Sequence, residues 1–145
     1  MNTAYRLPLD IRWSDLDPNF HVRHSVYYDW GAYCRISYLN AHDLGADALL
    51  QHQIGPILFR EEAVFRKEIL MGDTLSIDLS LVKARKDHSR WTIRHRLLKA
   101  EDTVAAIITV DGAWINSRLR RLATPPEQAA EVFDQMPRAE DFVWL

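Results

Sequence analysis

A dense cluster of ionisable side chains lies near the beginning of the sequence. Within ten residues the chain carries two carboxylates, Asp15 and Asp17, and two imidazoles, His21 and His24. A carboxylate can deprotonate water or attack a carbonyl carbon directly, and a histidine can transfer protons near neutral pH. The cluster is therefore a candidate reaction site. The alternative is that Asp17-Pro18-Asn19 only forms a turn and leaves both histidines exposed.

The same cluster also suggests a metal site. Asp-x-Asp followed by His-x-x-His supplies oxygen and nitrogen ligands suited to Zn²⁺ or to a harder divalent ion. Two histidines three residues apart need not converge where a loop enters a helix, so we expect no resident metal or cofactor. Metal analysis of the purified protein and activity after chelation distinguish the two interpretations.

A helix is predicted directly after the cluster, because apolar positions in residues 26–41 recur at steps of three and four. Ser25 is a suitable N-cap, and the helix is expected to end at about His42, before Gly45. Its apolar residues extend beyond one narrow stripe, so we expect the surrounding structure to enclose most of it. The free N–H groups at the start of such a helix attract anions and can polarise a carbonyl oxygen.

Strands are predicted on both sides of this helix. Residues 5–13 alternate apolar and polar side chains, with Pro8 typical of an edge or a bulge. After the helix we expect four strands in an antiparallel meander, at Ile57–Glu68, Leu75–Leu81, Trp91–Leu97 and Thr103–Ile115. A short helix, Glu127–Gln135, and a tail follow from about residue 125. The pattern predicts one α+β domain over residues 1–145, with a long central helix in the curve of a five-stranded antiparallel sheet.

Composition excludes several classes of protein. The chain has 145 residues and a net charge of −2, from 18 Lys and Arg against 20 Asp and Glu, which argues against a nucleic-acid partner. No apolar run has the length of a membrane span, and residues 1–13 lack the apolar segment of a signal peptide. The chain has one cysteine, Cys34, so an intramolecular disulfide is excluded. We expect a cytoplasmic protein with no membrane span.

Two segments carry a resemblance to a known family. The run from Arg12 to Trp30, RWSDLDPNFHVRHSVYYDW, resembles the N-terminal motif of the hotdog-fold acyl-CoA thioesterases, in the 4-hydroxybenzoyl-CoA thioesterase and YbgC-like branch. The segment 69–77, ILMGDTLSI, resembles a turn and strand of the same superfamily. In element order the resemblance covers almost the whole chain. It implies the hotdog fold and hydrolysis of an acyl-CoA to a carboxylic acid and CoA, without a cofactor.

The resemblance also implies roles for individual residues. Asp17 falls on the family's catalytic carboxylate, a general base or nucleophile. His24 falls on the position whose backbone N–H faces the thioester carbonyl, and in the YbgC-like branch this residue is itself a catalytic histidine. His21 matches the histidine of relatives that carry a Gly-His-Val-Asn-Asn run. We predict Asp17 and His24 as catalytic residues, and His21, Ser25 and Tyr27 as substrate contacts.

The motif departs from the family at three places. Phe20 stands where the family usually has glycine, Arg23 and His24 replace an Asn pair, and Trp13 replaces a Tyr. Because Phe20 lacks the freedom of glycine at positive φ, we expect a different loop path and an altered acyl pocket. The alternative function is therefore a non-catalytic hotdog protein that binds an acyl-CoA or acyl-carrier ligand. A dehydratase is disfavoured, because the helix lacks the corresponding His and acid.

Coenzyme A carries phosphates, which bind cationic side chains. Two groups of basic residues could supply them, the alternative being a solvated surface: Lys83, Arg85, Lys86 and Arg90 around one hairpin tip, and Arg118, Arg120 and Arg121 after the last long strand. From the first group we select Arg85, Lys86 and Arg90 as substrate contacts. The resemblance further implies a homodimer or a dimer of dimers with active sites at the interface, and an open sheet edge fits that expectation.

Three polar residues share positions with the predicted core. Glu61 has the strand parity of Phe59 and Ala63, and we expect a local bulge to turn it outward, since burying an unpartnered carboxylate is costly. His95 is predicted to be a hydrogen-bonded interior histidine. Cys34 lies in the middle of the helix, where a thiol is usually buried and inert.

Overall fold

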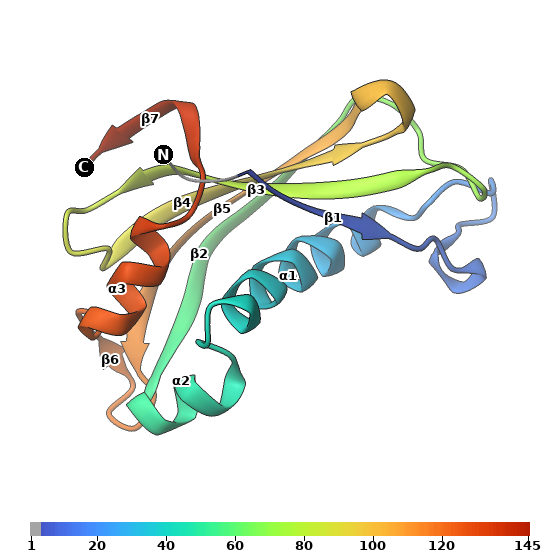
Figure 1. Cartoon of the computed structure of the whole chain (residues 1–145). Helices are drawn as coiled ribbons and strands as arrows, with labels where there is room; N and C mark the ends of the chain where they lie inside the picture. The colour runs from blue at the N-terminus through green and yellow to red at the C-terminus, as the bar shows by residue number, and fades with distance from the viewer. Residues whose placement is uncertain (1–3) are drawn as a thin grey trace.

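The computed structural model describes residues 4–145 and shows one long helix beside one curved sheet. The helix, α1 (His24–Ala41), lies along the concave side of the sheet (Figure 1). Five strands follow the order β1-β3-β4-β5-β2, and β6 pairs with β5 while β7 pairs with β3. Their bounds are β1 (Tyr5–Leu9), β2 (Ile54–Phe65), β3 (Leu75–Ala84), β4 (Arg90–Leu98), β5 (Val104–Asn116), β6 (Arg121–Leu122) and β7 (Arg138–Trp144). The expected helix-in-sheet architecture is confirmed.

The order of the strands corrects the predicted meander. β3, β4 and β5 form an antiparallel meander, but β2 pairs with β5 and not with its sequence neighbour β3. β5 is apolar on both faces, which is typical of a central strand. It is hydrogen-bonded to β4 along one edge and to β2 along the other. Alternation of side chains identifies a strand but not its partner, so the pattern could not place β2. As a result β2 forms one edge of the sheet.

The first strand is shorter than predicted. β1 ends at Leu9, and residues 13–15 form a turn of 3₁₀ helix, η1 (Trp13–Asp15). The backbone N–H of Arg12 donates to a carboxylate oxygen of Asp15 at 2.9 Å, which turns the chain away from the sheet. The prediction of a strand as far as Trp13 is therefore wrong.

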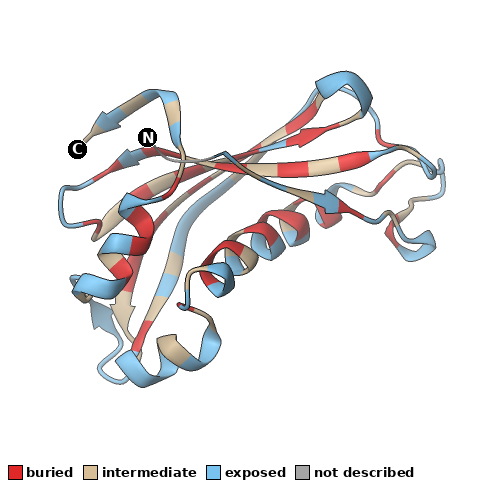
Figure 2. Ribbon diagram, viewed as in Figure 1, coloured by how far each residue is buried: buried red, intermediate tan, exposed pale blue. Residues whose placement is uncertain are grey.

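The helix α1 is buried on one side only. Its sheet-facing side chains, including Val26, Cys34 and Tyr38, are buried, and its opposite face is largely exposed (Figure 2). Tyr33 and Ile36 on that face are 49% and 37% exposed. The expectation that one chain encloses most of the helix is thus wrong. The buried thiol of Cys34 is confirmed, and burial raises its pKa to about 12.

Two short helices complete the fold. The α2 helix (Ala46–His52) lies between α1 and β2, and α3 (Glu127–Asp134) confirms the predicted C-terminal helix. Phe133 of α3 packs against Trp91 and Trp114, with 5.2 Å between ring centroids in each pair. The tail then forms β7, which runs parallel to β3. None of the helices within residues 4–145 is long and apolar enough to cross a membrane.

Candidate active site

The loop before α1 is held by backbone hydrogen bonds at both ends. The N–H of Asp17 donates to the carbonyl of His21 at 2.8 Å, and the N–H of Phe20 donates to the carbonyl of Asp17 at 2.9 Å. The N–H of Val22 donates to the carbonyl of Ile69 at 2.9 Å, which attaches the loop to the segment before β3. The polar cluster is therefore a fixed turn at the entrance to the helix.

Phe20 takes the backbone conformation that was expected only of glycine. Its φ is 64°, in the left-handed region, so the expectation that it avoids positive φ is wrong. This conformation costs a non-glycine residue roughly 1–2 kcal/mol. The surrounding turn fixes it, and the exposed ring lies 6.3 Å from the ring of Trp13, centroid to centroid.

The same turn orients the carboxylate of Asp17. Its Oδ1 accepts hydrogen bonds from the backbone N–H of Asn19 at 2.8 Å and of His21 at 3.2 Å. Its Oδ2 has no hydrogen bond to any residue in the described range 4–145. One oxygen is thus anchored while the other is available to a substrate or to water.

Asp15, the other carboxylate of the cluster, has a structural role. Its side chain is fully buried and accepts hydrogen bonds from the backbone N–H and the guanidinium of Arg12, each at 2.9 Å. Burial alone would raise the pKa of Asp15, but the hydrogen bonds from Arg12 outweigh it, and the pKa lies below its usual value. Its backbone carbonyl also accepts from the N–H of Arg23, directly before α1.

Replacing Asp15 with asparagine is expected to destabilise the fold by about 1–3 kcal/mol at pH 7, because buried hydrogen bonds to a charged acceptor are lost. The lowered pKa means that the carboxylate stabilises the folded state above the unfolded pKa of about 4, and that this contribution disappears as pH falls through the folded pKa. Urea unfolding measured from pH 7 to pH 3 should show the free energies of unfolding of the wild-type protein and of Asp15→Asn becoming more similar as the pH falls. A difference in unfolding free energy that stays constant over this pH range would contradict the role of Asp15 as a buried, ionised acceptor.

The helix begins without a side-chain cap. Arg23 occupies the N-cap position and makes no capping hydrogen bond, so the prediction of Ser25 as N-cap is wrong. The hydroxyl of Ser25 instead accepts a hydrogen bond from Nε of Arg23 at 3.1 Å. The first-turn N–H groups of His24 and Ser25 are consequently available to an acceptor from outside the helix.

A pocket of about 370 Å³ brings several predicted residues together. Asp17, His21, His24 and Tyr27 all line it, and the remaining lining includes the end of β2 and the residues that follow it: Phe65, Arg66, Lys67 and Glu68. The ring of Tyr27 is buried edge-on against Phe65, at 4.8 Å between centroids. Burial, and then the charge of Asp17, raise the pKa of Tyr27.

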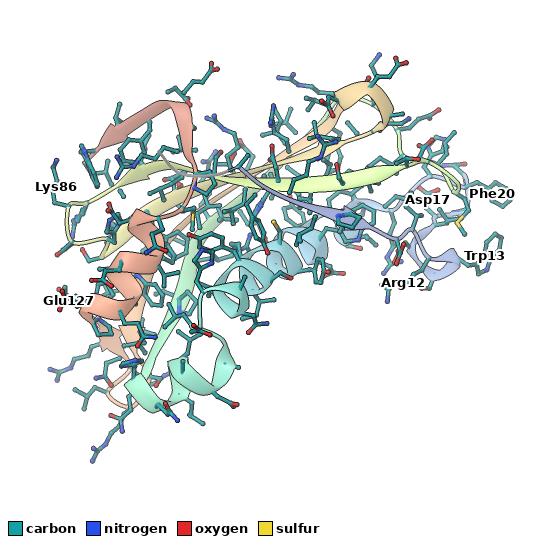
Figure 3. All side chains as sticks on the ribbon, viewed as in Figure 1. Arg12, Trp13, Asp17, Phe20, Lys86 and Glu127 are labelled. Carbon is teal, nitrogen blue, oxygen red and sulfur yellow. The ribbon has the colours of Figure 1, made fainter. Side chains whose placement is uncertain are left out.

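The other predicted contacts lie elsewhere in the chain. Ser25 is not part of the pocket lining. Arg85, Lys86 and Arg90 belong to the β3–β4 hairpin at the opposite end of the molecule, as the positions of Lys86 and Asp17 in Figure 3 show. There Lys86 lies 4.2 Å from the centroid of the Trp144 ring, and Arg90 lies 4.7 Å from that of Phe59.

The residues that follow β2 also belong to the candidate site, although the sequence pattern did not indicate them. The backbone N–H groups of Arg66 and Lys67 both donate to the carbonyl of Ala105 on β5, at 2.9 and 3.0 Å. This contact holds two cations at the pocket, and a carboxylate oxygen of Glu68 lies 3.0 Å from Nε2 of His21. The sequence does show two adjacent cationic residues at the end of a predicted strand. Placing them at the pocket, however, requires the pairing of β2 with β5, which the sequence pattern does not give.

Residues 11–133 match the thioesterase-like superfamily, which is most of the chain. The chain belongs to this superfamily. The prediction of a thioester hydrolase is confirmed at this level. A search of curated proteins found no match.

Solved structures confirm the hotdog fold for this member of the superfamily. A hypothetical protein from Staphylococcus aureus in complex with CoA is 18% identical, with a TM-score of 0.84 over 96% of this chain and 89% of that chain. A 1,4-dihydroxy-2-naphthoyl-CoA thioesterase from Synechocystis is 16% identical, with a TM-score of 0.80 over 91% and 96%. A thioesterase from Thermus thermophilus, complexed with coenzyme A and Zn, is 25% identical, with a TM-score of 0.71 over 89% and 91%.

The polar cluster does not form the metal-ligand set considered from the sequence. Among residues 4–145, no group of three or more His, Cys, Asp or Glu side chains is arranged to hold a metal ion. Asp15 is engaged by Arg12, and His21 is paired with Glu68. The residues that contribute to the candidate site are therefore Asp17, the start of α1, and the side chains around their common pocket.

A second polar group lies beneath the middle of α1. His95 is fully buried, and its Nδ1–H donates to the carbonyl of Asp78 at 2.9 Å, so its Nε2 accepts from Arg35 at 3.1 Å. Burial, followed by the charge of Arg35, lowers the pKa of His95 to about 3, and the predicted interior histidine is confirmed. A bulge between Leu58 and Arg60 is present, yet Glu61 lies 3.9 Å from Arg35. The expectation that Glu61 turns away from the helix is wrong.

Proposed function

We propose that this protein is an acyl-CoA thioesterase in which Asp17 acts on a thioester bound at the start of α1. The observation that carries the proposal is the position of Asp17. Two backbone N–H groups fix one of its oxygens, the other is unpaired among the described residues, and the side chain shares a pocket with the uncapped end of the helix. The reaction adds water to the thioester and yields a carboxylic acid and free CoA.

The geometry supports a division of roles within the pocket. The carbonyl oxygen of the thioester would accept hydrogen bonds from the N–H groups of His24 and Ser25, each contributing roughly 3–4 kcal/mol as negative charge develops on that oxygen. Oδ2 of Asp17 would deprotonate a water molecule that attacks the carbonyl carbon and displaces CoA thiolate. Alternatively it would attack that carbon itself, so that the C–S bond breaks, CoA thiolate leaves, and water then hydrolyses the mixed anhydride. The imidazole of His24 would transfer a proton or position the water.

The comparisons support coenzyme A as the carrier, because two of the similar structures contain it. The finer assignments remain proposals: membership of the 4-hydroxybenzoyl-CoA thioesterase and YbgC-like branch, one domain over residues 1–145, and a cytoplasmic location. The buried thiol of Cys34 fits a reducing compartment.

The exposed edge of the sheet supports a homodimer. β2 has twelve residues and pairs with β5 on one side only. Leu58, Phe59, Val64 and Phe65 on this strand are 40–52% exposed, which is unusual for a long free edge of a monomeric protein. We propose that two copies pair antiparallel along β2, which would also cover the exposed face of α1. We also retain a dimer of dimers as a possible higher assembly of this proposed dimer.

Arg66 and Lys67 are the proposed contacts for the CoA phosphates, since both line the pocket. Replacing both with alanine is expected to raise KM for an acyl-CoA about tenfold, with a smaller effect on kcat, because charge-assisted hydrogen bonds to phosphate are lost. The effect should shrink at high salt. Arg6→Ala on β1 is the matched control and should leave KM unchanged. An unchanged KM in the double variant would contradict this assignment.

The proposed function is tested by a panel of acyl-CoA esters with a thiol-release readout. The panel should vary chain length, aromatic or aliphatic character, and CoA or acyl-carrier protein as carrier. Hydrolysis of at least one acyl-CoA well above the rate without protein is expected. Tight binding without release of any thiol would instead indicate a non-catalytic acyl-CoA binding protein.

A further inference from the structure

A second cavity lies between α1, α3 and the concave face of the sheet. Its volume is about 130 Å³, and its lining is almost entirely apolar or aromatic. Tyr38 on α1, Leu58 on β2, Trp91 on β4 and Phe133 on α3 are part of that lining. One charged side chain, Arg35 on α1, also lines the cavity. A single guanidinium at the wall of an apolar cavity requires an explanation.

The charge of Arg35 is only partly compensated within the chain. Its side chain is 16% exposed, and Glu61 lies 3.9 Å away, beyond hydrogen-bond distance. The hydrogen bond to His95 brings no negative charge, because that histidine is neutral. Burial lowers the pKa of Arg35 by more than Glu61 raises it, so the site disfavours the cation that it holds. An anion bound beside Arg35 would remove this cost.

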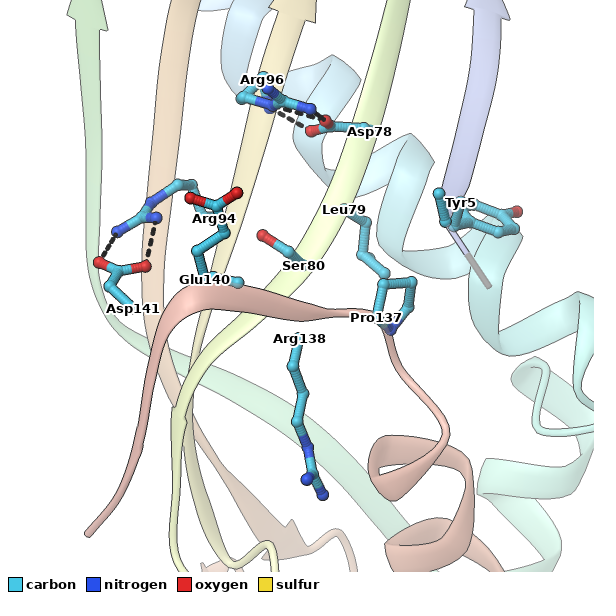
Figure 4. Close-up of a pocket in the computed structure, with 12 residues that line it drawn as sticks. Tyr5, Asp78, Leu79, Ser80, Arg94, Arg96, Pro137, Arg138, Glu140 and Asp141 are labelled. Atoms are coloured by element: carbon cyan, nitrogen blue, oxygen red, sulfur yellow. Dashed lines mark hydrogen bonds and ion pairs between the residues drawn. The ribbon is translucent and has the colours of Figure 1, made fainter. Parts of the chain in front are cut away.

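Arginines at a pocket on the opposite face of the sheet are paired differently. That pocket, of about 460 Å³, lies between β3, β4 and β7 (Figure 4). Arg94 forms two hydrogen bonds of 3.0 Å with Asp141, and Arg96 lies 2.6 Å from a carboxylate oxygen of Asp78. Both guanidinium groups are therefore neutralised by bidentate or close contacts, whereas Arg35 has only the 3.9 Å contact with Glu61.

The lining of the apolar cavity supplies no negative charge to Arg35. The cavity lining contains no carboxylate. A ligand that places carboxylate oxygens beside Arg35 would therefore be favoured at this wall.

We propose that this cavity is the acyl subsite of the thioesterase, and that it takes a short acyl group whose far end carries a carboxylate bound by Arg35. Size limits the acyl group, because an apolar cavity of about 150 Å³ holds a molecule of benzene. A cavity of about 130 Å³ therefore admits roughly six heavy atoms of the acyl group beyond its thioester carbonyl. The substrate class is the CoA half-ester of a short dicarboxylic acid.

We place the cavity next to an active site of the other copy in the proposed dimer. Within one chain, Arg35 lies eleven residues along α1 from His24, or about 16 Å, too far for a short acyl group. Phe65, at one end of β2, lines the pocket that contains Asp17, and Leu58, towards the other end, lines the acyl cavity. Antiparallel pairing of two β2 strands about a two-fold axis between Glu61 and Glu62 would place Phe65 of one copy beside Leu58 of the other, and we propose this register. The inference thus rests on the proposed function and on the dimer.

The test compares two esters of equal chain length, glutaryl-CoA and pentanoyl-CoA. The wild-type protein is expected to have a kcat/KM about tenfold or more higher for glutaryl-CoA. Arg35→Met should lower this ratio about tenfold or more, while Arg35→Lys should retain part of the preference because it keeps the charge. The matched control, Arg94→Met, changes an arginine on the opposite face and should leave the ratio unchanged. Circular dichroism and thermal unfolding establish that each variant is folded.

Two results would overturn the proposal. One is a wild-type protein that prefers pentanoyl-CoA, and the other is a ratio that Arg35→Met does not alter. Failure of the proposed function is distinguished by a separate measurement, the binding of glutaryl-CoA and pentanoyl-CoA by calorimetry. Even without turnover, tighter binding of glutaryl-CoA that is lost in Arg35→Met supports the subsite, and equal binding of the two esters contradicts it.

Discussion

Asp17→Asn is expected to lower kcat/KM for acyl-CoA hydrolysis by about 10²–10⁴-fold, the range typical for loss of a general base. Asparagine keeps an oxygen that can accept from the N–H groups of Asn19 and His21, so the turn and the fold should be preserved. Loss of the negative charge removes both the base and the nucleophile. Thiol release under single-turnover conditions measures the chemical step. Near-normal turnover in the folded variant would remove Asp17 from the mechanism.

His24 supplies the matched comparison for this variant. If only its backbone N–H acts, His24→Ala should reduce kcat far less than Asp17→Asn does. A loss comparable to that of Asp17→Asn would instead assign the proton transfer to the imidazole. The two variants together separate the contribution of the helix end, which alanine retains, from that of the side chain.

A double substitution on the sheet edge, Leu58→Asp with Val64→Asp, is expected to weaken dimerisation at least about 100-fold. Both side chains are exposed on β2, and pairing of two edges would bury the new carboxylates without partners, which costs several kcal/mol. Sedimentation at micromolar concentration should show a dimer for the wild-type protein and a monomer for the variant. Activity should fall with the dimer, because the proposed acyl subsite belongs to the other copy.

A substitution on another strand controls for the added charge. Val143 on β7 is also exposed, and Val143→Asp should leave both the dimer and the activity unchanged. A wild-type protein that sediments as a monomer would contradict the dimer. A monomeric double variant with full activity would show that each chain holds a complete site.

Local patterns predicted the elements of the fold better than their arrangement. The apolar repeat that identifies α1 and the alternation that identifies β3 are properties of each segment alone. Pairing of β2 with β5 depends on contacts between residues far apart in the sequence, and the turn at η1 depends on one hydrogen bond between Arg12 and Asp15. Neither leaves a periodic signal, so the meander and the end of β1 were predicted incorrectly.

The residues of the candidate site likewise fall into those that a local pattern identified and those whose roles depend on contacts in the folded chain. Asp17, His21 and His24 lie within eight residues of sequence, so their spacing alone identified them as candidates. The resemblance selected Asp17 as the catalytic carboxylate, but the structural role of Asp15 has no sequence signal, because it depends on burial of its side chain against Arg12. Arg35 and Glu61 meet across the helix and the sheet edge, where a bulge changes the parity of β2.

The most direct test of the central claim is a crystal structure with a non-hydrolysable thioether analogue of an acyl-CoA that retains the carbonyl group. We expect the carbonyl oxygen to lie about 2.7–3.1 Å from the backbone nitrogen of His24 or Ser25, with Oδ2 of Asp17 facing the carbonyl carbon. A carbonyl group bound away from the start of α1, with Asp17 directed into solvent, would contradict it.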